Sequence, residues 1–354
     1  MSDKPVGMTP YEAKRWDAIE EWRASTPRGL LERLPEGVRE RGRQVADKAM
    51  EVWDKVPGNE GLQKAFATAI RGGFDMTLDA TEKTISEKKV VARVTENLPI
   101  EAKTYQDLRA LDLFVLDERS PKNAKKRAAI AAGHGAAAGF IAGGATAAGA
   151  ASGGMGALPA AGVVALSVIA DTAAVSVGSM QGAAYVGAHY GYDPREPAER
   201  AMMMSLLAGV LAEDAARAQA LRQVRQLALD LAARRAVADL NESVLYRMML
   251  RLYGSLMLDT AKRSIAKGVP ILGAGIAAGS NYHSVRRTIV AADHAYPRRW
   301  LVEKYSSGAD EPIDVETVEK SVRDATSGED SSILDRLEDI DTADVDEGGD
   351  TKTA

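Results

Sequence analysis

The sequence predicts an all-α protein: a single multi-helix body with a central Gly/Ala-rich helical hairpin and a disordered acidic C-terminal tail. Three observations lead to this prediction. Apolar residues recur at spacings of three and four over most of the chain, which is typical of helices with one buried face. No stretch alternates apolar and polar residues for long enough to indicate a β-strand. Between residues 128 and 188 the chain consists mainly of Gly, Ala, Ser and small aliphatic residues, with Asp171 as its one formal charge.

The first helices are delimited by capping residues, Pro and Gly. Thr9 suits the N-cap of a helix, because Pro follows at the first helical position and Glu at the third, where it completes a capping box. This helix carries its Trp and Ile residues on one face, and it ends before Pro27. Residues 62–97 keep helical spacing, and Gly72-Gly73 interrupts them. The simplest prediction is two helices that meet at this pair.

Further capping residues mark the helices on either side of the Gly/Ala-rich segment. Thr104 and Asp107 have the spacing of a second capping box. Gly191 is suited to end the helix of the segment, since glycine adopts the left-handed conformation found after many helix ends. The next helix begins at Asp193, or a few residues later if Pro197 takes its first position.

The C-terminal part is predicted to be helical up to Tyr305. A long helical region covers residues 198–267, and a second small-residue patch at 269–281 precedes the last helix. The tail, residues 306–354, has 16 acidic and 4 basic residues and no aromatic ones. Such a composition cannot bury enough apolar surface to order the chain, so we expect the tail to be mostly disordered. A short helix at 333–340 is the exception.

These boundaries divide the chain into three parts. Residues 1–44 form an N-terminal tail with amphipathic helices, residues 45–305 form the helical domain, and residues 306–354 form the acidic tail. The net charge of −5 is the balance of a negative tail and a body that carries a diffuse positive excess. This excess suits an anionic surface such as the cytoplasmic leaflet of a membrane, and it is too diffuse to indicate nucleic acid binding.

The chain contains no cysteine, which excludes a disulfide framework, a thiolate zinc site and a cysteine nucleophile. Its first residues lack the charged and apolar regions of a signal peptide. We therefore expect a cytoplasmic protein, peripheral at the inner face of the cell membrane where it contacts one.

The Gly/Ala-rich segment is long enough to span a bilayer but only weakly apolar. Residues 128–151 reach the required length of about 20, although Ala and Gly gain far less than Leu or Ile from leaving water. A carboxylate such as Asp171 at the centre of a membrane costs about 2.5 to 3.5 kcal/mol. Three alternatives stay open: a hairpin buried in protein that turns near residues 152–159, a hairpin that inserts conditionally, and a permanent span.

Small residues at every fourth position favour close helix packing in the segment. A helix face with this spacing lets a neighbouring backbone approach closely. The second small-residue patch has glycines suited to pack against the first. The predicted helix-packing residues are Gly135, Gly139, Gly143, Gly273, Gly275 and Gly279.

The motifs for nucleotide, metal and catalytic sites are weak. Gly133-His134-Gly135 and Gly273-Ala274-Gly275 resemble the start of a dinucleotide fingerprint, but no strand-turn-helix-strand unit surrounds them. No two of the four histidines have the spacing of a zinc site on one helix. We therefore expect no nucleotide, no metal and no other cofactor. Asp171, His189 and Asp193 are the weak candidates for catalytic residues; the sequence favours a non-enzymatic protein without deciding the question.

Four segments stand out in order along the chain. They are GHGAAAG at 133–139, HYGYD at 189–193 followed by Glu199-Arg200, KGVPILGAGIAAGSN at 267–281, and PRRWLVEKY at 297–305. With these segments, the chain from about Val45 to Tyr305 resembles the EcsC family. These bacterial and archaeal proteins are named after the third product of a locus that also encodes an ABC transporter. The N-terminal Trp-bearing helix and the acidic tail lie outside the resemblance.

The resemblance implies a helical, intracellular protein connected with membranes or transport. Some family members are labelled peptidase-like, but no catalytic constellation in this sequence supports that label, and no catalytic residues carry over. In the last segment Arg298, Arg299 and Trp300 are candidates for an interfacial anchor at a membrane surface. An Arg–Trp contact on the protein surface is the alternative.

We therefore expect a non-enzymatic, peripherally membrane-associated or lipid-contacting protein, accessory to transport or secretion. Its expected partner is membrane lipid or a membrane protein such as a transporter. Two alternatives stay open. One is a hydrolase-type enzyme that uses Asp171, His189 and Asp193, and the other is a membrane-inserting or pore-forming protein that uses the hairpin at 128–188.

Overall fold

The computed structural model describes residues 4–25, 60–120, 160–211, 219, 222–225, 238–266, 274–305, 315–327 and 331–337. These residues form helices and contain no strand, which confirms the all-α prediction. The first half of the predicted hairpin and its turn, residues 128–159, lie outside the described residues. The helices are α1 (Pro10–Ser25), α3 (Glu60–Thr84), α4 (Glu87–Val94), α5 (Tyr105–Arg109), α6 (Leu113–Arg119), α8 (Ala160–His189), α9 (Pro197–Leu211), α11 (Ala238–Ala266), α12 (Ala274–Tyr305) and α13 (Val315–Ala325). A further short helix covers residues 331–337.

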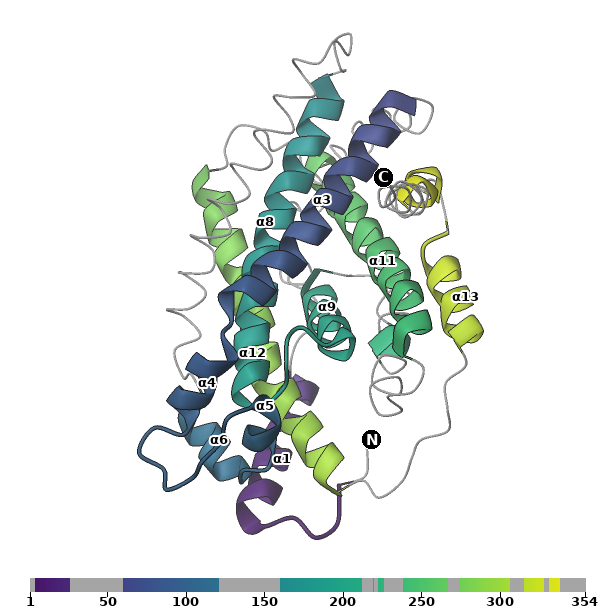
Figure 1. The fold of residues 1–354 in the computed structure, drawn as a ribbon. Helices are drawn as coiled ribbons and strands as arrows, with labels where there is room; N and C mark the ends of the chain where they lie inside the picture. Colours follow the sequence, from purple (N-terminus) through teal and green to yellow (C-terminus); the bar gives the residue numbers. More distant parts are fainter. Residues whose placement is uncertain are drawn as a thin grey trace, which may run out of the picture.

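Helix α8 lies at the centre of the bundle and contacts α3, α9, α11 and α12 (Figure 1). From Thr172 to His189 it is buried on almost every side. A helix that is buried all round needs apolar or small residues on every face, which the Ala, Val and Gly content of α8 provides. The short helices α4, α5 and α6 gather with α1 at one end of the bundle, which is the lower end in Figure 1.

Glycines of α8 let α12 approach closely, although they are not the glycines that the sequence predicted. A Cβ atom on Gly182 would lie 2.5 Å from Ile289, and one on Gly187 would lie 2.5 Å from the ring of Tyr296. Of the predicted packing residues, Gly275 and Gly279 lie in the first turns of α12. The others, Gly135, Gly139, Gly143 and Gly273, fall outside the described residues.

Helix α3 runs without interruption through Gly72 and Gly73, so the break predicted there is wrong. Gly73 is needed for packing instead, because a Cβ atom on it would lie 2.9 Å from Ala173 of α8. Two helices do cover this stretch, as predicted, but they meet at Ile85 and Ser86.

The capping predictions are confirmed where the structure describes them. The Thr9 amide donates to the Glu12 carboxylate at 2.8 Å, and the Glu12 amide donates to the Thr9 hydroxyl at 3.3 Å. Thr104 and Asp107 form the second capping box. Helix α9 begins at Pro197, the later of the two predicted starts.

Part of the acidic tail is helical. Helix α13 was not predicted, since the sequence analysis expected disorder over residues 315–327. The short helix predicted at 333–340 is present at 331–337. Helix α13 lies beside α11 in Figure 1, and together the two tail helices bury a narrow apolar stripe. Its members, each at most 1% exposed, are Val318, Val322, Ile333, Leu334 and Leu337. In the sequence these few apolar residues stand among many acidic ones, and the composition of the tail therefore favoured disorder.

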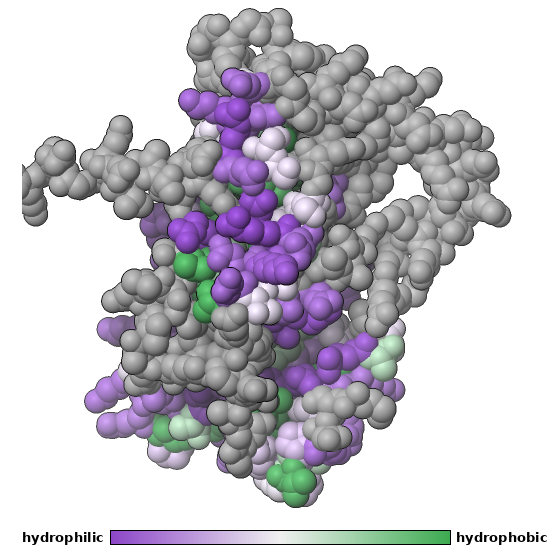
Figure 2. Space-filling view, turned by 90° about the vertical axis from the view of Figure 1, so that its right-hand side faces the viewer, coloured by the Kyte–Doolittle hydropathy of each residue, from purple (hydrophilic) through white to green (hydrophobic). Residues whose placement is uncertain are grey.

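The described surface is largely polar on the face drawn in Figure 2, where hydrophobic residues form only small separate spots. Within the described ranges, no helix has both the length and the apolar character that crossing a bilayer requires. Asp171 lies within α8, and its side chain is outside the described part of that helix.

Candidate functional site

Two of the catalytic candidates, His189 and Asp193, and the three predicted interfacial residues lie near the corner that follows α8, at the lower end of the bundle. Gly191 turns the chain there with a φ of +82°. The Tyr192 amide donates to the Gly187 carbonyl oxygen at 3.1 Å, which satisfies an acceptor in the last turn of the helix. A Cβ atom on Gly191 would lie 2.4 Å from the Tyr105 carbonyl oxygen, so the corner requires glycine both for its conformation and for its closeness to α5.

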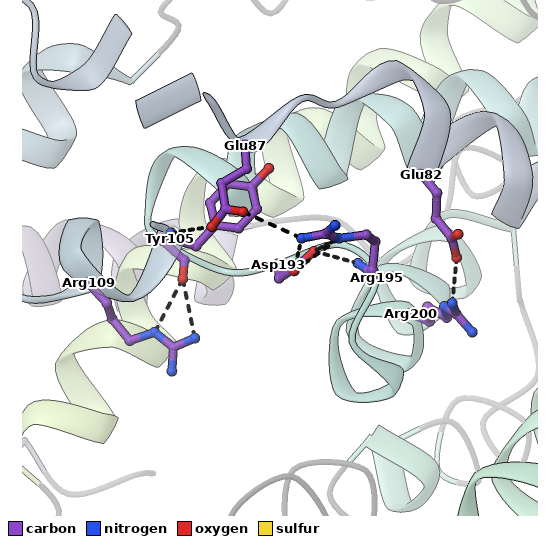
Figure 3. A network of polar contacts seen from close by, with 8 residues as sticks. Glu82, Glu87, Tyr105, Arg109, Asp193, Arg195 and Arg200 are labelled. Carbon is purple, nitrogen blue, oxygen red and sulfur yellow. Dashed lines mark hydrogen bonds and ion pairs between the residues drawn. The ribbon is translucent and has the colours of Figure 1, made fainter. Parts of the chain in front are cut away.

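A first polar network joins this corner to α4 and α5 (Figure 3). Arg195 forms an ion pair with Asp193 at 2.6 Å and lies 3.6 Å from Glu87. The other oxygen of Glu87 accepts from the Tyr105 amide at 2.8 Å, which is the first amide of α5. The Asp193 carboxylate therefore serves to hold the connection between α8 and α9 against the short helices.

A second network connects α9 with α12 around a buried carboxylate. Glu199 is 1% exposed and pairs with Arg299, whose Nε atom also donates to Glu303 at 2.6 Å. The guanidinium of Arg299 lies 4.1 Å from the ring centroid of Tyr192, and the Tyr192 hydroxyl donates to Glu303 at 3.0 Å. Burial raises the pKa of Glu199 to about 7, although Arg299 opposes the shift. This carboxyl can hold a proton near neutral pH.

A third network brings α1 and α6 together with the turn that follows α8. Asp117 accepts from the hydroxyls of Tyr190 at 2.6 Å and Tyr11 at 2.9 Å, and it pairs with Arg15 at 3.1 Å. Burial, together with the charge of Asp117, raises the pKa of Tyr11 to about 12. Both phenols therefore stay protonated at neutral pH and act as hydrogen-bond donors.

A cavity of about 290 Å³ opens between the α5–α6 connection and the end of α12. It is lined by Arg109, Ala110, Leu111, Trp300, Glu303 and Lys304. The Trp300 indole donates to the Arg109 carbonyl oxygen at 3.0 Å, and Lys304 pairs with Glu12 at 2.8 Å. The lining thus offers charges of both signs beside an aromatic wall, which suits binding of a small polar molecule more than bond-breaking chemistry.

The three catalytic candidates are not assembled into one site. His189 is buried with its Nδ1 atom 2.7 Å from the Tyr185 carbonyl oxygen, and Asp193 is bound to Arg195. Asp171 and His189 belong to the same helix, eighteen positions apart. A rise of 1.5 Å per residue separates their backbones by about 27 Å, so they cannot form a catalytic dyad. In the part of the chain that the structure describes, no group of three or more His, Asp or Glu residues could hold a metal ion.

The predicted interfacial residues lie inside the packed end of the bundle. Trp300 is 5% exposed, and Arg299 is held by Glu199 and Glu303. Arg298 donates to Glu20 at 2.9 Å and lies over the ring of Trp16. In this conformation the three residues connect α12 with α1, α5 and α9, and they present no indole to a membrane surface.

Several residues of these networks gave no signal in the sequence. Arg109 and Asp117 lie in the short helices α5 and α6, outside the segments that stand out in the sequence, and only their contacts in the folded chain distinguish them. The tyrosines are different, because Tyr190 and Tyr192 stand beside Gly191 in the HYGYD segment. The sequence predicts a helix end at Gly191 and a new helix soon after it, and the structure places this segment at the corner between α8 and α9.

The comparison with protein families gives one result. The sequence model of the EcsC protein family matches residues 13–301. No curated protein and no solved structure matches the chain. The match begins inside α1, so the N-terminal Trp-bearing helix, which we had placed outside the resemblance, is part of it. The fold is all-α over the described residues, as expected, and the match covers most of the sequence. The chain belongs to the EcsC protein family.

Proposed function

We propose that the protein contacts the anionic surface of a membrane peripherally, without catalysing a reaction, and is accessory to transport or secretion. One observation carries the proposal. Four basic residues, Lys122, Lys125, Lys126 and Arg127, stand directly before the Gly/Ala-rich segment that continues into α8. A polybasic run next to a weakly apolar segment is the composition of a chain that adsorbs to anionic lipid.

The magnitudes favour reversible contact over insertion. Each Lys or Arg near an anionic leaflet contributes about 1 kcal/mol, so four of them strengthen binding by roughly three orders of magnitude. The apolar gain from Ala and Gly is small by comparison. Binding of this kind depends on the charge of the lipid and weakens as salt is added.

The state of the candidate catalytic groups also supports a non-enzymatic role. Of the three catalytic candidates, Asp193 and His189 are engaged in contacts that hold helices or turns together. The connection with transport rests on the family, which takes its name from a locus that also encodes an ABC transporter. A peripheral protein beside such a transporter would have membrane lipid or the transporter itself as its partner.

The proposal is tested by flotation with phosphatidylcholine vesicles, prepared with and without phosphatidylglycerol. The wild-type protein should float with the anionic vesicles only, and added salt should release it. Replacing Lys122, Lys125, Lys126 and Arg127 by Ala should abolish flotation.

The matched control removes the same number of charges at exposed positions of the described chain, Lys64, Lys88, Lys89 and Lys103, and should still float. If the control variant lost flotation to the same extent, binding would depend only on the net charge of the protein, which would contradict the role of the basic run. Release of a trapped dye by the wild-type protein would contradict peripheral contact and favour insertion.

A further inference from the structure

The cavity between the α5–α6 connection and the end of α12 has two opposite charges on its wall that meet at one tyrosine. Arg109 and Glu303 both line the cavity. The guanidinium of Arg109 lies 4.5 Å from the ring centroid of Tyr192, whose hydroxyl donates to Glu303 at 3.0 Å. Tyr192 is 1% exposed. A buried side chain therefore holds the two charges in place relative to each other.

Arg109 has a neutral hydrogen-bond partner in place of an acidic one. Its Nε and Nη2 atoms donate to the Gly191 carbonyl oxygen at 3.4 and 3.2 Å, and no carboxylate of the described residues forms an ion pair with it. The elements that hold it, which are α5, the turn after α8 and the last turns of α12, lie entirely within the described ranges. A guanidinium carries five N–H donors in a planar fork, so further donors remain for an anionic group in the cavity.

The second cation of the wall, Lys304, is already neutralised. Its ammonium group pairs with the Glu12 carboxylate at 2.8 Å and lies 4.6 Å from the ring centroid of Trp300. The side chain of Glu12 is 4% exposed, so this ion pair is fixed against the core. Of the two cations in the lining, Arg109 is therefore the one that can receive an anionic group.

The negative charge of the wall is only partly neutralised. Glu303 shares Arg299 with Glu199, so one guanidinium serves two carboxyl groups. A carboxylate offers about four lone-pair sites. Glu303 accepts one hydrogen bond from Arg299 and one from Tyr192, and its side chain is 36% exposed. The remaining sites can accept from an ammonium group in the cavity.

We propose that the cavity binds a free α-amino acid, whose carboxylate pairs with Arg109 and whose ammonium group pairs with Glu303. Both charged groups of such a ligand are attached to one carbon atom, which matches two charges held on one tyrosine. A carboxylic acid without the ammonium group would be repelled by Glu303, and an amine without the carboxylate would be repelled by Arg109.

The size and the remaining lining of the cavity suit this ligand. Its volume of about 290 Å³ is near the small end of the range for small-molecule sites, which is roughly 300 to 1,000 Å³. Leu111 and Trp300 form the apolar part of the wall, against which the side chain of the amino acid packs. The basic run at 122–127 is not needed for this site, which therefore does not depend on the membrane contact proposed above.

The test is isothermal titration calorimetry of the full chain with each of the standard α-amino acids. It is carried out at pH 8, above the pKa of about 7 of Glu199, so that Arg299 is shared between two carboxylates. At least one amino acid should bind. Its deaminated acid and its decarboxylated amine should each bind at least about tenfold more weakly, because each lacks one charge-assisted pair. Binding of none of the amino acids, or equal binding of the acid or the amine, would overturn the proposal.

Two substitutions assign the charges of the ligand to their partners. Arg109→Gln should remove the advantage of the amino acid over its amine and keep its advantage over the deaminated acid. Glu303→Gln should do the reverse. A general disturbance of the fold would weaken all three ligands alike, so this crossed pattern separates contact with the ligand from loss of structure. Unchanged ratios in both variants would show that neither residue binds the ligand.

A third substitution fills the cavity and leaves every charge in place. Ala110 is exposed and lines the cavity, so Ala110→Trp should abolish binding without lowering the melting temperature. The matched control, Ala18→Trp, adds the same side chain at an exposed alanine of α1 outside the lining and should bind as wild type does. Undiminished binding by Ala110→Trp would overturn the proposal. Flotation with anionic vesicles should be the same in all these variants, so the amino-acid site and the membrane contact can each fail alone.

Discussion

Among single residues, Gly191 shows most directly how the chain positions its candidate site. Its φ of +82° and its closeness to the Tyr105 carbonyl oxygen leave no room for a Cβ atom. We expect Gly191→Ala to lower the free energy of unfolding by at least about 2 kcal/mol, because it adds backbone strain to a clash with backbone atoms. Urea unfolding measures this loss.

Gly72 provides the matched control for that substitution. It lies within α3, and a Cβ atom there would have no neighbour within 4 Å. Gly72→Ala should raise stability by roughly 0.5 to 1 kcal/mol, since it only restricts the unfolded chain. A similar effect of both substitutions would contradict the role assigned to the corner.

Glu12 gives a prediction on pH dependence. Although burial opposes ionisation, hydrogen bonds from Lys304, Tyr305 and Thr9 lower the pKa of Glu12 to about 2. The folded-state pKa is below the unfolded value, so Glu12 stabilises the protein above pH 4.5, and this contribution is lost as the pH falls towards 2. We expect up to about 3 kcal/mol from this residue at neutral pH.

The measurement compares unfolding of wild type and Glu12→Gln between pH 7 and pH 2. The difference in stability should be largest at neutral pH and should vanish in acid. Glu101→Gln, at an exposed glutamate of the α4–α5 connection, should show no such trend. A difference that stays constant with pH would mean that packing, and not ionisation, explains the effect of Glu12.

Contacts between residues close in the sequence could be predicted, whereas contacts between distant residues could not. The capping boxes at Thr9 and Thr104 involve residues three positions apart, so the sequence contains the whole motif. The pairing of Arg299 with Glu199 involves residues one hundred positions apart, and the fold alone brings them together. The same limit applies to Asp117, which receives its donors from α1 and from Tyr190 in the turn after α8.

At the scale of whole elements, the packing of the tail helices on α11 is the largest departure from expectation. Gly254 of α11 makes room for them, since a Cβ atom there would lie 2.7 Å from Leu337 and 3.0 Å from Leu334. Arg251 donates to Thr326 at 2.9 Å and pairs with Asp335 at 2.9 Å. These contacts hold both tail helices against the helical domain. The family match ends at residue 301 and therefore does not include the tail helices.

Truncation tests whether the tail helices belong to the folded body. Deleting residues 306–354 exposes the face of α11 that the five buried apolar side chains cover. Since burying each such side chain contributes about 1.5 to 3 kcal/mol before the cost of ordering the tail, we expect a loss of at least about 3 kcal/mol in unfolding free energy.

A shorter deletion serves as the control. Removing residues 338–354 leaves α13 and the helix at 331–337 in place and should change the melting temperature little. Full stability of the longer deletion would show that these helices do not contribute to the core.

Helix α3 illustrates why element boundaries were harder to predict than elements. Two adjacent glycines usually weaken a helix, and the sequence alone does not show why a continuous helix would contain them. The reason lies in α8, whose residue Ala173 fills the space that Gly73 leaves. A tertiary contact thus overrides a local preference, and the helix continues to Thr84.

At the scale of the whole molecule, the fold class could be predicted, whereas the sequence indicated single residues of the candidate site but not how they come together. Apolar spacing and the absence of alternation are properties of the entire sequence, and both indicated an all-α body. The networks at the lower end of the bundle combine α1, α5, α6, α8, α9 and α12. Their assembly depends on how long helices cross, which one sequence does not reveal.

The central claim is that the protein contacts membranes peripherally, and fractionation of cells tests it most directly. In low salt the protein should sediment with the membranes, and a wash with alkaline carbonate should release it into the supernatant. Replacement of the four basic residues at 122–127 should move it to the supernatant before the wash. Protein that stays with the membranes through carbonate, or that never sediments with them, would contradict the account.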